Sequence, residues 1–313
     1  MHCAIAPAQH GSPLSGGDRR SWIGGAPSTL QVVRSDPVID VSHLSPLEQT
    51  ALLTQYARAL DSRRPRPILG DTLADEIVTK IDYDFAGLGV PASVVCQAAL
   101  RTKMLDERVR TFTSEHPDAV VVDLGAGVDT GVFRVSPPGT VDWYSVDLPR
   151  VIALRDQFMP ASEHAHSIAA SVADHNWPDP IPADRPAMVI ADGLFAFLSE
   201  PVIVGVFSRI TEHFKSGELA FNDYGHIGWF SRVAVKLAPQ RMFTHVGSQW
   251  DYAGFKDARV PEMWNPRLTL VEETSLAHAP EVELFPGWIR LATKVSGKFK
   301  TSARKARILR YRF

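Results

Sequence analysis

The feature that most constrains the fold is the segment VVVDLGAGVDT at residues 120–130. A run of β-branched residues ends in Asp123, and Gly125 and Gly127 follow with one residue between them. Strands that are apolar on both faces lie inside parallel sheets, and glycines after such a strand let a ligand approach the backbone N–H groups. The segment therefore predicts a buried parallel strand with a ligand site at its carboxyl end.

Strands and helices alternate from this segment onward. VDWYSVDLP, HAHSIAASVAD and AMVIADG each predict a further strand, and ELAFNDYG predicts a fifth. LPRVIALRDQFM and EPVIVGVFSRITEHF have the spacing of amphipathic helices between these strands. This β-α-β series predicts an α/β fold with a Rossmann-like, doubly wound and mostly parallel sheet.

We expect three parts along the 313 residues. Residues 1–40 are rich in Gly, Ser, Pro and Ala, and predict a flexible leader. Residues 41–118 predict an N-terminal helical cap, and residues 119–313 predict the core with a lid insertion at 224–267. The helices of the cap are expected at residues 45–60, 71–80 and 91–114, with capping residues at Ser45 and Asp71.

Arg101 is out of place in the third of these helices, because it lies on an apolar stripe. An unpaired buried charge costs several kcal/mol, so this guanidinium needs a carboxylate or phosphate partner. It either snorkels or pairs with a structural aspartate, or it binds the acid group of a ligand. Its neighbours on the stripe are Val94, Ala98, Leu105, Val109 and Phe112.

An acidic residue follows the second strand. Asp147 lies twenty residues after Gly127 and would suit a ribose hydroxyl. A nicotinamide dinucleotide remains an alternative at this point, weakened because Thr130 stands where the third glycine of that fingerprint would be.

The third and fourth strands also end in polar residues. Ser171, Val172 and Asp174 lie where an adenine amino group would be, and Asp192 ends the fourth strand. Polar groups at four successive strand ends describe a pocket for a nucleoside with an amino-acid head, which is the shape of S-adenosylmethionine. Arg101 could then pair with the methionyl carboxylate.

These segments together resemble the leucine carboxyl methyltransferase family. VVDLGAGVDT, YSVDLP, IADGLFAFL and the preceding LRTKMLDERV are similar to its motifs, and TQYARALDSRRPRPILGDTLADEIVTKIDYDF resembles its bacterial, polyketide-methylating branch. The resemblance runs from about residue 45 to the C-terminus. It implies a class I methyltransferase fold, S-adenosylmethionine as the donor and an oxygen acceptor, often a carboxylate. The expected cofactor-binding residues are Arg101, Asp123, Gly125, Gly127, Asp147, Leu148, Ser171, Val172, Asp174 and Asp192.

The insertion at 224–267 is rich in aromatic residues, which suit a flat, polycyclic or long acyl acceptor. Tyr224, His226, Trp229 and Trp250 are the expected acceptor-binding residues. A carboxylate acceptor is already ionised at neutral pH and needs placement, not a base. A phenol or alcohol would need one, and His226 is then the candidate.

The sequence therefore predicts an S-adenosylmethionine-dependent O-methyltransferase of a small molecule, with a polyketide-like carboxylate as the expected acceptor. The alternatives are a methyltransferase of a protein C-terminal carboxylate and a scaffold protein that binds the cofactor without turnover. Cys3 and Cys96 give neither a disulfide framework nor zinc spacing, so no metal is expected. We expect a cytoplasmic monomer or homodimer that binds neither nucleic acid nor membrane.

Seven basic residues and no acidic one lie between Lys298 and Phe313. The segment ends in RILRYRF, which predicts a last strand at the edge of the sheet with solvated arginines. A phosphate-binding tail is the alternative.

Overall fold

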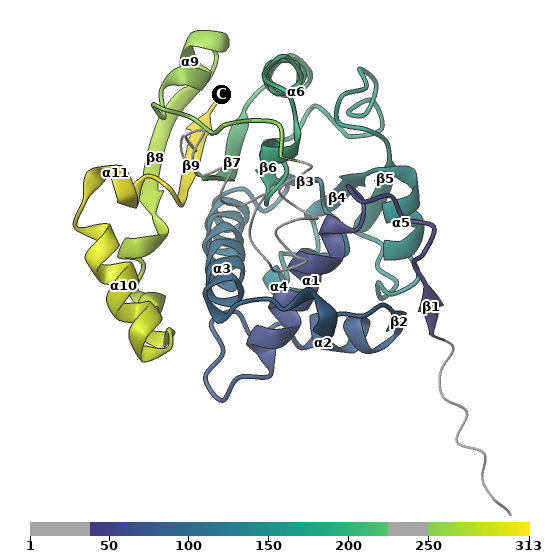
Figure 1. The fold of residues 1–313 in the computed structure, drawn as a ribbon. Coiled ribbons are helices and arrows are strands. Elements are labelled where there is room, and N and C mark those ends of the chain that lie inside the picture. Colours follow the sequence, from purple (N-terminus) through teal and green to yellow (C-terminus); the bar gives the residue numbers. More distant parts are fainter. Residues whose placement is uncertain (1–37, 225–249) are drawn as a thin grey trace, which may run out of the picture. The chain divides into compact units, whose positions relative to one another are not determined.

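Seven strands form the main sheet of the computed structural model, which describes residues 38–224 and 250–313 (Figure 1). The strand order is β5-β4-β3-β6-β7-β9-β8. The strands are β3 (Val120–Leu124), β4 (Asp142–Asp147), β5 (Ala165–Ala169), β6 (Ala187–Ala191), β7 (Gly217–Asp223), β8 (Thr269–Ser275) and β9 (Arg307–Arg312).

The first five of these strands are parallel, and β9 is antiparallel to both of its neighbours. The chain moves outward from β3 to β4 and β5, returns to β6 on the other side of β3, and continues to β7. The predicted doubly wound, mostly parallel α/β sheet is therefore confirmed. Its order reverses between β3 and β6, which is the place where ligands bind in open α/β sheets.

Helices cover both faces of the sheet. α3 (Ala92–Glu115) packs Leu100 and Met104 against one face, where Met188 and Ile190 of β6 lie. α6 (Glu200–His213) packs Phe207 on the opposite face. Burial on both faces explains why β3 opens with three consecutive β-branched residues, Val120 to Val122. α3 was expected in the N-terminal cap, yet it forms one layer of this core.

The other N-terminal helices form a third apolar cluster with α5 (Pro149–Arg155). α2 (Thr72–Thr79) begins where predicted, since the side chain of Asp71 accepts from the Ala74 N–H at 3.0 Å. The capping contact of Ser45 also forms, with its N–H 2.7 Å from Glu48 Oε2. Regular helix nevertheless begins five residues later than predicted, in α1 (Thr50–Ser62), because residues 46–49 form turns.

The prediction of an edge position for the last strand was wrong. β9 lies between β7 and β8, and all three of its arginines contact carboxylates, although Arg312 stays 68% exposed. Arg307 is buried against Asp223 and Glu273, and Arg310 lies between Glu218 and Glu272. The carboxylates of both neighbouring strands therefore neutralise a strand whose sequence alone looks too charged for a sheet interior.

The remaining elements are short. They are β1 (Ile39–Asp40) and β2 (Ile81–Asp82), which pair in parallel, α4 (Gly131–Val135), α9 (Val260–Trp264), α10 (Gly287–Gly297), α11 (Lys300–Ala303) and four 3₁₀ turns (Ala86–Leu88, Phe195–Phe197, Leu276–His278 and Pro280–Leu284). The expected lid insertion is described at Tyr224 and from Trp250 onward, and in the latter part Phe255 and Ala258 join the core on the α6 side. No helix within residues 38–224 and 250–313 is both long and apolar enough to cross a bilayer.

Candidate active site

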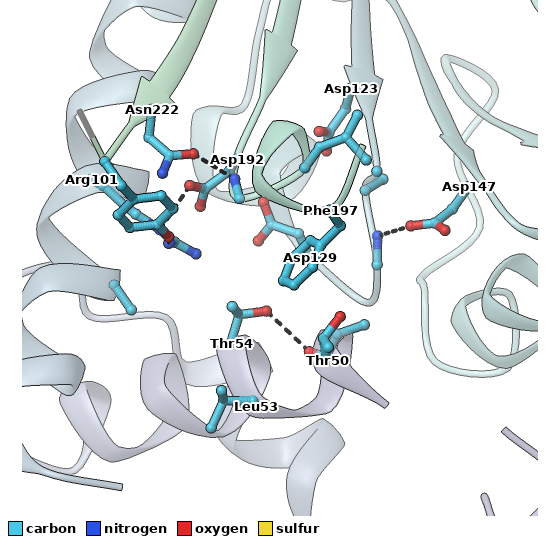
Figure 2. A pocket seen from close by; sticks show the side chains of 18 of the residues that line it. Thr50, Leu53, Thr54, Arg101, Asp123, Asp129, Asp147, Asp192, Phe197 and Asn222 are labelled. Atoms are coloured by element: carbon cyan, nitrogen blue, oxygen red, sulfur yellow. Dashed lines mark hydrogen bonds and ion pairs between the residues drawn. The ribbon is translucent and has the colours of Figure 1, made fainter. Parts of the chain in front are cut away.

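A cavity of 550 Å³ lies at the carboxyl ends of β3, β4, β5, β6 and β7. α1 and α3 line its other side. Figure 2 shows Thr50, Leu53 and Thr54 of α1 below the cavity, with the strand-end residues above them. The volume is in the range of sites for small molecules and cofactors, and the position is the reversal point of the sheet.

The glycine loop after β3 forms one wall of the cavity. Gly125 and Gly127 have φ angles of +67° and +55°, which residues with a Cβ rarely adopt. A Cβ at Gly125 would lie 2.9 Å from Leu194 Cδ1, and one at Gly127 would lie 3.1 Å from the Cβ of Ala51. Both glycines are therefore required by conformation and by close packing, as the sequence predicted for a ligand-binding turn.

Asp147 ties the end of β4 to this loop. One carboxylate oxygen accepts from the Gly127 N–H at 2.7 Å, and the other accepts from the Leu148 N–H at 2.7 Å. Burial raises the pKa of Asp147 above its ordinary value, although both N–H groups oppose that shift. Each oxygen keeps a lone pair for one more donor, so the carboxylate can still accept from a ligand hydroxyl.

Asp123 is the least satisfied acid at the cavity. It is buried at the end of β3, and its Oδ2 has no hydrogen-bond partner among the described residues. Burial and the neighbouring charge of Asp129 raise the pKa of Asp123 well above its ordinary value. An orphaned oxygen in a ligand cavity indicates a place for a donor from the ligand.

Arg101 lies on α3 beside the ends of β6 and β7. Its Nε is 2.8 Å from Asp192 Oδ1, and its Nη1 donates to the hydroxyl of Tyr224. Burial lowers the pKa of Arg101, but Asp192 and Tyr224 outweigh burial and raise it, so the guanidinium stays charged. Nη2 has no hydrogen-bond partner within the described part of the chain, which leaves it available to an acid group.

The ends of β5, β6 and β7 complete the strand-end wall of the cavity. Ser171 and Val172 line it, whereas Asp174 does not and instead accepts from the Ser171 N–H at 3.3 Å. Asn222, which the sequence analysis missed, accepts from the Gly193 N–H at 2.5 Å and fixes the turn after β6 (Figure 2). A direct role for Asp174 at the ligand has no support in this geometry.

Two of the four expected acceptor-binding residues line the cavity. Tyr224 and Trp250 lie edge to face, with ring centroids 5.1 Å apart. Phe197, on the turn after β6, lines the cavity as well; it lies in the IADGLFAFL motif but was not among the expected acceptor-binding residues (Figure 2). His226 and Trp229 lie outside the described residues.

A buried ion-pair network supports the residues that follow the glycine loop, and the sequence analysis missed this network. Arg134 of α4 contacts Asp71 at 2.8 Å, Asp106 at 3.0 Å and Asp129 at 2.5 Å. Arg58 of α1 contacts the same Asp129 oxygen at 3.3 Å. The sequence signal was Asp129, the acid two residues after Gly127, whose partners Arg58 and Arg134 come from two separate helices.

Comparison with known proteins decides the family. The model of the leucine carboxyl methyltransferase family matches residues 51–211. The chain is 35% identical to the tetracenomycin polyketide synthesis O-methyltransferase TcmP of Streptomyces glaucescens, over 78% of this chain and 90% of that one. The chain belongs to the leucine carboxyl methyltransferase family. The resemblance seen in the sequence is confirmed.

Other members and neighbours agree with this assignment. The S-adenosyl-L-methionine-dependent methyltransferase dpfgK of Gibberella zeae is 31% identical over 75% of this chain and 84% of its own length. A crystal structure from Thermobifida fusca assigned to the methyltransferases has the same fold, with a TM-score of 0.51, 20% identity and coverage of 82% of this chain and 93% of that one. The protein is an S-adenosylmethionine-dependent methyltransferase with a class I fold, and the nicotinamide alternative is set aside.

Replacing Asp123 by asparagine is expected to stabilise this methyltransferase at neutral pH. The pKa of Asp123 is higher in the folded state than the unfolded value of about 3.9. The free energy of unfolding therefore falls as pH rises from the unfolded pKa to the folded pKa. An amide of the same shape does not ionise, so the free-energy cost of a buried carboxylate is absent. The melting temperature should rise by about 2–4 °C for each kcal/mol of stability gained. Scanning calorimetry at pH 4 and pH 8 should show the larger gain at pH 8.

Asp61→Asn is the matched control. Asp61 is equally buried, but its carboxylate accepts from the Ile68 and Leu69 N–H groups at 3.0 and 2.8 Å, so its asparagine variant should lose stability. A loss in Asp123→Asn as large as that in Asp61→Asn would show that Asp123 is a satisfied structural residue.

Proposed function

We propose that this methyltransferase methylates a carboxylate oxygen of a small, flat, polyketide-like acceptor. The observation that carries the proposal is the similarity to the polyketide O-methyltransferase TcmP along nearly the whole of that chain. The described cavity supports it in two ways, one at its cofactor end and one at its acceptor end.

At the cofactor end, the residues present fit S-adenosylmethionine. Asp147 would accept from the ribose hydroxyls, and Ser171 and Val172 would border the adenine. Arg101 and Asp192 would bind the carboxylate and ammonium of the methionyl group. Among the described residues, Arg101 Nη2 has no hydrogen-bond partner and neither has Asp123 Oδ2, so both belong to residues of the cavity wall that retain polar capacity.

The acceptor end is mainly apolar and carries one unpaired cation. Phe197, Tyr224 and Trp250 line it, as does Lys305. The other lining cations are Arg58, Arg101 and Arg307, each of which contacts an aspartate. Lys305 has no acidic partner in the described ranges, so it can attract an anionic acceptor to a flat aromatic site.

Methyl transfer to a carboxylate requires the protein to bind and orient the two substrates. When bound, S-adenosylmethionine would supply an electrophilic methyl group, and transfer of this group to an acceptor oxygen would release S-adenosylhomocysteine. A carboxylate is ionised at neutral pH, so no side chain has to remove a proton. The aromatic residues position the acceptor and exclude water, which favours reaction through orientation and desolvation.

The pH profile of methyl transfer tests the proposal. With anthraquinone-2-carboxylate as the acceptor and radiolabelled S-adenosylmethionine as the donor, we expect product formation at a rate that is flat above about pH 6. A histidine base such as His226 would add an ascending limb near its own pKa, and its glutamine variant would lose about 10²–10⁴-fold.

Two further acceptors separate the alternatives. 2-Hydroxyanthraquinone has the same ring system with a hydroxyl as the nucleophile, and a short peptide ending in leucine presents a protein-like carboxylate. We expect neither to be methylated at a comparable rate. Preference for the hydroxyl compound or for the peptide would replace the proposed acceptor class.

A further inference from the structure

Large apolar side chains gather on the outside of α10. Eight large hydrophobic residues are exposed among those that the structure describes, and four of them lie within residues 288–299. They are Trp288, Leu291, Val295 and Phe299, with exposed fractions of 71%, 65%, 47% and 62%. We call these four residues the α10 stripe.

The spacing of three and four residues places Trp288, Leu291 and Val295 on one side of α10, and Phe299 follows two residues after the helix ends at Gly297. Ile289 is the one buried residue of α10, so this helix is held to the fold along a narrow line. Figure 1 shows α10 and α11 at the margin of the fold, outside α3. The stripe is thus an unpartnered ridge on a protruding helix, and contiguous exposed apolar surface usually marks a contact site.

The charged residues within α10 and the segment that follows it are all positive. Residues 287–300 contain Arg290, Lys294, Lys298 and Lys300 and no acidic residue. Arg290 and Lys294 contact Glu283, whereas Lys298 and Lys300 have no acidic partner in the described structure. A surface that fits this helix must therefore accept apolar side chains and carry negative charge nearby.

The small area of the α10 stripe and the positive charge of the residues beside it distinguish between the classes of partner. A stable protein interface buries about 800 Å² on each side and uses 20–30 residues, which four side chains on one ridge do not approach. Two copies paired through this helix would also place their lysines against each other. An apolar face with Trp, Leu and Phe beside a basic face is typical of helices that lie in the interface of an anionic membrane.

We propose that α10 lies on the surface of an anionic lipid bilayer, with the α10 stripe in the boundary between headgroups and acyl chains. Lys298 and Lys300 would contact the lipid phosphates. This is contact with a membrane surface, not a span, and it departs from the sequence expectation that the protein binds no membrane.

The α10 stripe is also joined to the wall of the cavity. The imidazole Nε2 of His278 lies 3.0 Å from the carbonyl oxygen of Gly297, at the end of α10. His278 belongs to the same turn as Leu276, which lines the cavity. A bilayer bound by α10 would thus lie near one wall of the active site.

Sedimentation of the full-length protein with lipid vesicles tests the proposal. We expect it to bind vesicles of equimolar phosphatidylcholine and phosphatidylglycerol at low salt and to bind pure phosphatidylcholine far less. Leu291→Glu should reduce binding about tenfold or more, because one of the deepest apolar contacts is replaced by a charge. Lys298→Gln combined with Lys300→Gln should weaken binding and reduce its dependence on salt.

Met263→Glu is the matched control, because Met263 is 75% exposed on α9 and lies outside the α10 stripe. It should bind vesicles as the unaltered protein does. Equal binding by Leu291→Glu, or no binding by the unaltered protein, would overturn the proposal. A dimer that forms without vesicles and dissociates on Leu291→Glu would identify a second copy as the occupant and would overturn it as well.

Discussion

Replacing Arg134 by methionine is expected to lower the free energy of unfolding by about 3–5 kcal/mol, the cost of removing one partner from a buried ion pair. The guanidinium is 10% exposed and contacts the carboxylates of Asp71, Asp106 and Asp129. Methionine fills a similar volume but leaves these acids short of a cation in a site that excludes water. Urea unfolding followed by circular dichroism measures the loss.

The same variant should have an altered pH dependence. Burial raises the pKa of Asp129, but Arg134 and Arg58 outweigh it and lower this pKa below its ordinary value. Because the pKa of Asp129 is lower in the folded state than the unfolded value of about 3.9, its carboxylate stabilises the fold above that value. This stabilisation is lost as pH falls below it toward the folded pKa. The difference between the two proteins should therefore shrink when unfolding is measured below pH 4.

Arg110→Met provides the control for Arg134. Arg110 is on α3, it is 44% exposed, and its ion pair with Asp106 is 4.0 Å long. Exposed pairs of this kind contribute about 0–1 kcal/mol, so this variant should stay close to the unaltered protein. Equal losses in the two variants would mean that the buried network contributes no more than a surface pair. If Arg134→Met does not fold, Arg134→Met with Asp106→Asn should recover part of the stability.

The parts of the fold that the sequence predicted are those specified by local pattern. Val120, Val121 and Val122 are buried on both faces, and this continuous apolar run is visible without knowledge of the neighbours. Gly125 and Gly127 adopt positive φ angles that few other residues tolerate, so their spacing already defined the loop. The cofactor side of the cavity followed, since parallel strands end at one edge of the sheet.

The parts that were missed depend on partners distant in sequence. Arg310 is acceptable inside the sheet because Glu218 and Glu272 lie on the two neighbouring strands, and neither is near it in the sequence. Asp71 was predicted as a helix cap, but its second oxygen also binds Arg134, sixty-three residues away. Local pattern indicates that such residues are polar, whereas only the fold shows what neutralises them.

Arg101 was the one misplaced charge whose role the sequence could suggest, and its replacement by methionine is expected to weaken cofactor binding by about 2–4 kcal/mol. The cost arises because the acid group of the ligand would lose a charged hydrogen-bond donor in a buried site. A reduction of about 30- to 1000-fold in affinity for S-adenosylhomocysteine follows, at 1.4 kcal/mol for each tenfold change. Isothermal titration calorimetry measures it directly.

Two comparisons separate a ligand contact from a structural one. Arg108→Met, two turns along the same helix, removes an ion pair with Glu272 that lies outside the cavity, so its affinity should be unchanged. Arg101→Met with Asp192→Asn removes the carboxylate that the single variant leaves unpaired, and should restore the melting temperature but not the affinity. If Arg101→Met bound S-adenosylhomocysteine as tightly as the unaltered enzyme, Arg101 would serve only to hold Asp192 and Tyr224 in place. Because Nη2 is the atom of this guanidinium that has no partner among residues 38–224 and 250–313, we expect the loss of affinity to be the larger effect.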